Sequence, residues 1–248
     1  MLARILGRHK MFLHASDHGF ACHVAMDGYW EIWLTQFFAR TIKPGMVAID
    51  VGANYGYYTL LFGDAVTRSG RVLAVEPNPG AAALLRDTVL LNGLADRIRV
   101  VESALGPPGL DEAPFFIPWT EPKNARVVGD EIQGGGDTVM VPVTTLDALA
   151  ADLPAIDIIK IDAEGAELGI LDGMRHVLRR HRPKLVLEFN AMRYPNPAAF
   201  LHELLALYGQ VQVISFSGIA EPIAPDTILT TRAGQDWNLL FTPPDAGA

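Results

Sequence analysis

The residues best suited to chemistry lie where three short apolar runs end. The first run leads into a glycine turn in AIDVGANYGYYTLLFG (48–63), which places Asp50 beside Gly52 and Gly56. A ligand at this point would meet backbone N–H groups and the N-terminus of the helix that follows. The glycines are spaced GxxxG, whereas GxGxxG cradles a dinucleotide pyrophosphate, and a carboxylate at Asp50 suits a cation or an amine better than a phosphate. Helix packing alone can also require this glycine spacing.

The next two apolar runs end in residues that suit a nucleoside. LAVEPNPG (73–80) carries Glu76 at the end of its run. An acid at this position can accept hydrogen bonds from both hydroxyls of a ribose, or it can cap the N-terminus of the following helix. RIRVVESALG (97–106) ends in Ser103 and Ala104, a pair that can lie along an adenine ring and bond its edge. Together the three strand ends predict a nucleoside pocket without a phosphate site.

A parallel sheet is the element that would bring these strand ends together. Runs rich in Val, Ile and Leu predict strands at 46–50, 71–75, 98–101, 156–161 and 184–189. Helix-like stretches lie between or after them, at about 56–66, 79–92, 165–180 and 197–208. This alternation predicts a parallel sheet covered by helices on both faces. The tail differs, because 210–216 and 238–243 read as two strands joined only by a loop, which predicts an antiparallel hairpin at one sheet edge.

Two regions stand apart from this alternation. Residues 1–44 are predicted to be a helical or irregular extension to a domain that spans 45–248. Within the extension, 28–45 predicts a helix that packs its aromatic face on the main domain, and that face is formed by Trp30, Trp33, Leu34, Phe37 and Phe38. Alternatively, Tyr29 and Trp30 line a substrate mouth. Residues 102–140 are rich in proline and lack periodicity, which predicts an irregular insertion and a candidate lid. Its side chains either contact an acceptor or anchor the loop, and the candidates are Phe115, Phe116, Trp119 and Asn124.

Composition excludes several classes of protein. The chain has 248 residues, half of them apolar, which is ample for one domain with a buried core. Its formal net charge of −8 argues against nucleic acid as a partner, and the basic run at 175–184 reads as a helix C-terminus. No stretch is long and apolar enough for a signal peptide or a membrane span. The single cysteine, Cys22, favours a reducing compartment, so we expect a cytoplasmic location. Aromatics near Trp30 permit a homodimer without requiring one.

The order of these motifs resembles class I S-adenosylmethionine-dependent methyltransferases, and more closely the FkbM family. The resemblance covers about residues 28–190. It rests on GYWE (28–31), KPGMVAIDVGANYGYYT (43–59), AVEPNP (74–79), Leu91-Asn92, SALG (103–106), TTLDAL (144–149), IIKIDAEGAELGILDGM (158–174) and the strand that carries Glu188. Where the family reads DVEG, this chain has Asp162-Ala163-Glu164-Gly165.

The resemblance implies an α/β fold, a Rossmann-like three-layer sandwich whose mostly parallel, seven-stranded sheet has an antiparallel last strand. It implies S-adenosyl-L-methionine as the cofactor, bound over the first three strands. Members of the family usually O-methylate hydroxyls of sugars or natural products, so the expected acceptor is a small molecule or a glycan. The residues that the resemblance assigns to the cofactor are Asp50, Gly52, Ala53, Asn54, Gly56, Tyr58, Thr59, Glu76, Pro77, Asn78, Ser103, Ala104 and Asp162.

The segment IIKIDAEGAE (158–167) adds candidate catalytic groups. In this topology Asp162 and Glu164 should face the transferred methyl, and Glu188 ends the next strand over the same cleft, with Asn190 beside it. A carboxylate here can orient an acceptor hydroxyl or take its proton. Alternatively, the three carboxylates can hold a divalent cation such as Mg²⁺, although acids on two strands fix no coordination geometry and no metal is assigned. We expect Glu188 and Asn190 to contact the acceptor. As structural contacts, Lys160 can form an internal ion pair with an acid, Glu164 can cap its helix, and Glu167 is explained in the same way.

Other activities fit the sequence less well. A methyltransferase acting on RNA or protein keeps the same pocket, but the acidity disfavours RNA, and no NPPY-like tetrapeptide follows the fourth strand. A non-catalytic protein with a vestigial cofactor site is disfavoured because the strand-end motifs are complete. The glycine spacing disfavours an NAD-dependent oxidoreductase.

Overall fold

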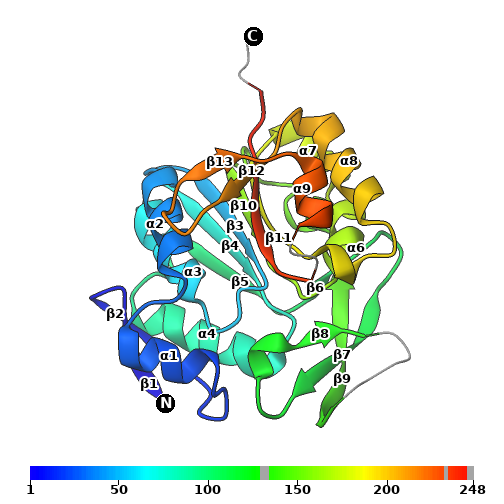
Figure 1. The fold of residues 1–248 in the computed structure, drawn as a ribbon. Helices are drawn as coiled ribbons and strands as arrows, with labels where there is room; N and C mark the ends of the chain where they lie inside the picture. The colour runs from blue at the N-terminus through cyan, green and yellow to red at the C-terminus, as the bar shows by residue number, and fades with distance from the viewer. Residues whose placement is uncertain (129–133, 232–233, 245–248) are drawn as a thin grey trace.

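A single twisted sheet of eight strands runs through the centre of the protein (Figure 1). The structure is a computed structural model, and it describes residues 1–128, 134–231 and 234–244. In spatial order the strands are β13 (Ala220–Pro222), β12 (Gln212–Ile214), β14 (Trp237–Phe241), β11 (Lys184–Phe189), β10 (Ile158–Ile161), β3 (Val47–Val51), β4 (Arg71–Val75) and β5 (Ile98–Val101). The run from β11 to β5 is parallel, whereas β14 is antiparallel to both of its neighbours. The predicted mostly parallel sheet with an antiparallel last strand is therefore confirmed, and β13 adds a strand beyond the seven expected.

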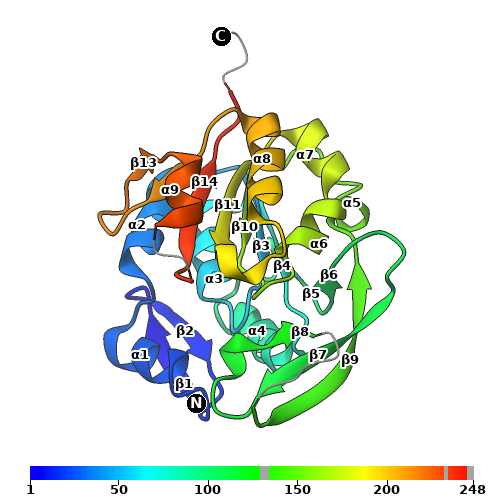
Figure 2. The ribbon, with the colours of Figure 1, turned by 45° about the vertical axis from the view of Figure 1, so that its right-hand side comes forward.

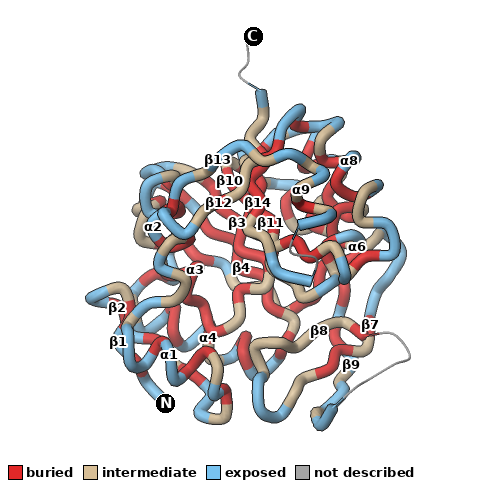
Figure 3. Tube along the Cα trace, in the orientation of Figure 1, coloured by how far each residue is buried: buried red, intermediate tan, exposed pale blue. Residues whose placement is uncertain are grey.

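Each face of the sheet is covered by its own helices, because successive side chains of a strand point to opposite faces. Along β3, Ala48 packs into one core and Ile49 and Val51 into the other. The first core includes residues of α1 (Phe20–Asp27), α2 (Ile32–Thr41), α3 (Tyr57–Ala65) and α4 (Pro79–Leu91). The second includes residues of α5 (Leu146–Leu149), α6 (Glu167–Asp172), α7 (Arg175–His181), α8 (Pro197–Tyr208) and α9 (Pro225–Thr230). Figures 2 and 3 show these three layers and the buried strands between them.

The N-terminal extension is more ordered than its sequence indicated. Besides the predicted helix α2, which buries Leu34, Phe37 and Phe38, it contains a hairpin of β1 (Leu2–Ile5) and β2 (His9–Phe12). The hairpin packs on α4, where the backbone N–H of Phe12 donates to the hydroxyl of Thr88. The extension therefore shares the core of the first face.

The prediction of an irregular insertion at 102–140 was wrong. The described part of this segment forms a small second sheet in the order β6 (Ala104–Leu105), β9 (Gly136–Thr144), β7 (Glu112–Pro118) and β8 (Arg126–Val127), with a 3₁₀ turn, η1 (Pro122–Asn124). The prolines of this segment led us to predict no strands there, because a proline has no backbone N–H to donate to a strand ladder. Here β8 pairs with β7 only at Phe115 and Phe116, so Pro114 and Pro118 fall outside that pairing.

The tail and the helix after β10 also differ from expectation. The two tail strands do pair antiparallel, but β14 lies between β11 and β12 instead of in an edge hairpin, and β13 and α9 occupy the connection that was read as a loop. The helix expected at 165–180 is two helices, α6 and α7. The break falls at Gly173, where an added Cβ would lie 2.2 Å from the carbonyl oxygen of Gly106. In the described residues, no helix has the length and apolarity required to cross a membrane.

Candidate functional site

The ends of β3, β4 and β10 open into one pocket, as the parallel register requires. Most residues assigned to the cofactor from the sequence line it, namely Gly52, Ala53, Asn54, Tyr58, Glu76, Pro77, Asn78, Ser103, Ala104 and Asp162. The remaining three, Asp50, Gly56 and Thr59, lie outside the lining. The N-terminal extension contributes Phe20, Trp30 and Glu31, and the insertion contributes further residues, including Phe115 and Asn124.

The two glycines of the first turn have different tasks. Gly52 has a φ of +75°, and a Cβ there would lie 1.8 Å from the carbonyl oxygen of Asp162, so only glycine lets the turn after β3 approach the turn after β10. Gly56 has a φ of +99°, and a Cβ there would lie 2.4 Å from a methyl carbon of Leu85 in α4. Gly56 therefore serves helix packing, while Gly52 shapes the pocket.

Glu76 is held as an oriented carboxylate. Its Oε2 accepts a hydrogen bond from the backbone N–H of Asn54 at 2.7 Å, and its Oε1 accepts one from the N–H of Asn78 at 2.8 Å. Helix α4 is instead capped by the side chain of Asn78, so Glu76 is not needed as a cap. Burial raises the pKa of Glu76 to about 7, although the two backbone hydrogen bonds oppose the shift. Each oxygen retains a lone pair with which it can accept from a ligand hydroxyl.

The residues that follow β5 offer a ligand fewer hydrogen-bonding groups than expected. The hydroxyl of Ser103 donates toward the backbone carbonyls of Ala104 and Pro142, each at 2.9 Å. Its proton is therefore committed to the protein, and Ser103 presents only an acceptor to the pocket. Ala104 is buried and lies in β6, the strand that joins the main domain to the insertion.

A buried charge network lies under the pocket. The ammonium of Lys160 donates to Asp162 Oδ2 at 3.1 Å and lies 3.9 Å from Asp50 Oδ1. Asp50 Oδ2 accepts from the hydroxyl of Thr59 at 2.6 Å, whereas Oδ1 has no hydrogen-bond partner. Burial lowers the pKa of Lys160, but the carboxylates of Asp162 and Asp50 outweigh that effect and raise it overall. Burial raises the pKa of Asp50. The internal ion pair expected of Lys160 is confirmed.

Glu31 lines the pocket, although no role was predicted for its side chain. It precedes α2 in a left-handed conformation, with a φ of +37°, and its carboxylate accepts from the Tyr58 hydroxyl at 2.7 Å. Burial and the negative charge of Asp162 raise the pKa of Glu31. Its only signal was its place in GYWE. Glu31, Asp50 and Asp162 thus surround a single ammonium, Lys160, and this excess of carboxylates suits a cationic ligand group.

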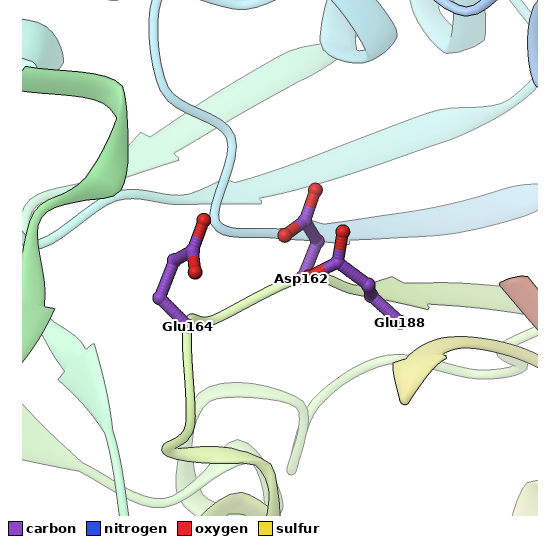
Figure 4. A group of neighbouring side chains, drawn as sticks. All are labelled: Asp162, Glu164 and Glu188. Carbon is purple, nitrogen blue, oxygen red and sulfur yellow. The ribbon is translucent and has the colours of Figure 1, made fainter. Parts of the chain in front are cut away.

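The predicted catalytic carboxylates do come together (Figure 4). Asp162, Glu164 and Glu188 each place one oxygen within 4.8 Å of the other two. Burial, followed by the charge of Asp162, raises the pKa of both Glu164 and Glu188. The cap role considered for Glu164 is not seen, whereas Glu167 is structural: it accepts from the backbone of Ala163 and Gly165 and from the Tyr194 hydroxyl.

Arg193, in the 3₁₀ turn η2 (Ala191–Arg193), joins this cluster without any sequence signal. Its guanidinium lies 3.0 Å from Glu164, 2.8 Å from Glu188 and 3.1 Å from Asp236. Two of the three carboxylates that a metal ion would need are therefore already paired with Arg193, and nothing else in the described residues supports Mg²⁺. Asn190, expected as an acceptor contact, instead caps η2 and donates to Asp236 at 3.0 Å.

Part of the insertion lines the pocket, and its role as a lid stays a prediction. Lys123 and Asn124 of η1 line the pocket, and the Lys123 ammonium lies 5.6 Å from the centre of the Trp30 ring. Phe115 also lines the pocket, while Phe116 supports Arg126 at 5.3 Å. Trp119 is exposed and donates to Asp137, so it anchors the insertion.

Comparison with known proteins identifies one family. Residues 50–210 match the family model described as "Methyltransferase FkbM domain". Two curated relatives are protein-L-isoaspartate O-methyltransferases, from Aeropyrum pernix (33% identical over 109 residues, 42% of this chain and 41% of that one) and Triticum aestivum (31% over 132 residues, 47% and 52%). The match thus spans about half the length of these relatives. Among solved structures, a methyltransferase FkbM from Methylobacillus flagellatus aligns with a TM-score of 0.50 at 20% identity, over 79% of this chain and 43% of that one.

Proposed function

The chain belongs to the FkbM methyltransferase family, and on this premise we propose that it transfers a methyl group from S-adenosylmethionine to a hydroxyl oxygen of a small molecule, a sugar or a glycan. The observation that carries the proposal is the position of Asp162. This residue lines the nucleoside pocket and also belongs to the carboxylate cluster with Glu164 and Glu188. One side chain thus joins a site for the methyl donor to a site for a proton acceptor.

The pocket residues fit this cofactor. Glu76 offers oriented lone pairs to the two ribose hydroxyls. Asp50 lies outside the pocket lining, and with Asp162 and Glu31 it adds to a negative charge that suits a sulfonium and an ammonium. Gly52 keeps the turn free of a side chain. When bound, S-adenosylmethionine supplies an electrophilic methyl group on a sulfonium sulfur.

The carboxylate cluster supplies the proton acceptor. A base is most effective when its pKa lies near the working pH. Burial and the charge of Asp162 raise the pKa of Glu188 to about 9, so the ionised form of Glu188 is a stronger base than an ordinary carboxylate. Glu188 takes the hydroxyl proton, Asp162 orients the hydroxyl toward the methyl group, and Arg193 fixes Glu188 and Glu164 in place.

A protein carboxylate is the second candidate acceptor, because the two curated relatives are named as isoaspartate methyltransferases. An anionic reacting oxygen would be repelled by the three clustered carboxylates, so the hydroxyl remains favoured.

The two acceptors are separable by experiment. A panel of sugars, hydroxy acids and an isoaspartyl peptide is incubated with the enzyme and S-adenosylmethionine, and S-adenosylhomocysteine release is measured. Turnover of a hydroxylated compound that is lost in Glu188→Gln supports the proposal. Turnover of the isoaspartyl peptide alone contradicts it. A carboxylate acceptor needs no base, so undiminished turnover in Glu188→Gln contradicts the role of that residue.

A further inference from the structure

A second cleft opens beside the carboxylate cluster. This outer cleft is lined by Lys123, Asn124, Arg126, Glu164, Gly165, Arg193 and Asp236. It shares Lys123, Asn124 and Glu164 with the cofactor pocket, so the two hollows are neighbours around the same side chains. An acceptor that reaches Glu188 and Asp162 therefore has the outer cleft available for the rest of its structure.

Two of the three cations in the outer cleft form no close ion pair with the described residues, although Lys123 acts at longer range on the carboxylates of Asp17, Glu31 and Glu164. Arg193 is occupied by ion pairs to Glu164, Glu188 and Asp236. Lys123 and Arg126 make no ion pair with any residue that the structure describes. Each is instead held over an aromatic ring.

The aromatic contacts orient these cations without consuming their donors. Arg126 lies 5.3 Å over the ring of Phe116, which is buried and therefore a firm support. A guanidinium stacked on a ring keeps its in-plane N–H groups free, and these match the paired oxygens of a carboxylate or a phosphate. The ammonium of Lys123, 5.6 Å from the Trp30 ring centre, retains its three donors as well.

The charge of the site reverses between its two ends. The outer cleft carries three cations against the carboxylates of Glu164 and Asp236, although the whole chain has a net charge of −8. The inner end holds Asp162, Glu164 and Glu188 within 4.8 Å of one another. An anionic group would be repelled at the inner end and attracted at the outer end. This arrangement therefore orients an anionic acceptor with its charged group in the outer cleft.

We propose that the methyl acceptor carries an anionic oxygen group, a carboxylate or a phosphate, that Lys123 and Arg126 bind in the outer cleft while a neutral hydroxyl of the same molecule faces Glu188. The inference rests on the proposed function, because it assigns the acceptor class of that same site. It explains why two half-buried cations of an acidic protein form no close ion pair among the described residues.

Calorimetry with simple probes tests the inference. Inorganic phosphate, glucuronate and glucose are titrated into the protein at constant ionic strength, with and without saturating S-adenosylhomocysteine. Phosphate or glucuronate should bind, and glucose should bind at least about tenfold more weakly than glucuronate, because its neutral C6 hydroxyl lacks the charge-assisted hydrogen bonds. The stronger of the two anions identifies the group as a phosphate or a carboxylate.

Charge-removing variants locate the binding. Arg126→Gln should weaken the preferred anion about tenfold, and Lys123→Gln should weaken it as well. Arg179→Gln removes the same charge from an exposed position on α7 and should have no effect. Failure of both anions to bind, glucose affinity equal to that of the preferred anion, or unchanged affinity for the preferred anion in Arg126→Gln overturns the inference. Arg126 does not line the cofactor pocket, so S-adenosylhomocysteine affinity reports separately on the proposed function.

Discussion

Replacing Glu76 with glutamine should weaken cofactor binding and remove its dependence on pH. Both carboxylate oxygens are anchored by backbone N–H groups, at 2.7 and 2.8 Å, and both can accept from the ribose hydroxyls. Glutamine keeps one acceptor and turns an N–H₂ group toward a backbone N–H. Because a hydrogen bond to a charged group contributes about 1.5–3 kcal/mol, we expect a loss of about 2 kcal/mol, or about 30-fold in the affinity for S-adenosylhomocysteine.

The pH dependence follows from the raised pKa of about 7 that burial gives Glu76 in the ligand-free protein. Ribose hydroxyls donate to the ionised carboxylate, so binding lowers this pKa and releases a proton. Affinity should therefore rise with pH, and about tenfold weaker binding is expected at pH 6 than at pH 8.

Isothermal titration calorimetry in buffers of different ionisation enthalpy measures both the affinity and the proton release. The matched control is Glu203→Gln on α8, outside the pocket, which should bind as the wild type does. An affinity that is equal at pH 6 and pH 8 in the wild type, or a pH dependence that survives unchanged in Glu76→Gln, would refute the role given to Glu76.

Three further outcomes are expected. Glu188→Gln should lower kcat at least about 100-fold, because a proton acceptor is lost, while S-adenosylhomocysteine affinity stays within about threefold; an unchanged kcat would remove Glu188 from catalysis. Gly52→Ala should lower the free energy of unfolding in urea by about 2 kcal/mol or more, and by more than Gly109→Ala, which shares a positive φ but meets no neighbouring atom; equal losses would contradict the close approach to Asp162. The ligand-free protein should melt at a higher temperature at pH 6 than at pH 8. Burial raises the pKa of Glu76 from 4.5 to about 7, so the native state binds more protons than the unfolded chain in this range. A higher melting temperature at pH 8 in thermal denaturation would contradict the raised pKa of Glu76.

The central layer of the fold was predictable because its signals are local. Buried parallel strands are continuous apolar runs, and β4 and β11 begin and end at the predicted residues. Helix α4 begins at Pro79, its predicted first residue, because a proline fits the first turn of a helix. The small sheet of the insertion was not predictable in this way, because its prolines break the pattern of apolar residues that marks a strand.

Asp162 and Glu188 were predictable from their place at strand ends, and so was the ion pair of Lys160, whereas Arg193 and Glu31 were not. Asp162 and Glu188 follow neighbouring parallel strands, so topology alone brings them together. Arg193 reaches the cluster through a 3₁₀ turn, and Glu31 reaches the pocket from the N-terminal extension in a left-handed conformation. Neither position carries a periodic or positional signal. The same holds for Lys123 and Arg126, which face the site only because the insertion folds over it.

A crystal structure of the complex with S-adenosylhomocysteine tests whether the pocket binds the methyl donor beside the carboxylate cluster. We expect both ribose hydroxyls within hydrogen-bond distance of the Glu76 carboxylate and the sulfur at the end of the pocket formed by Asp162, facing Glu188. A ligand bound elsewhere, or one bound here with its sulfur directed away from Asp162 and Glu188, would contradict this expectation.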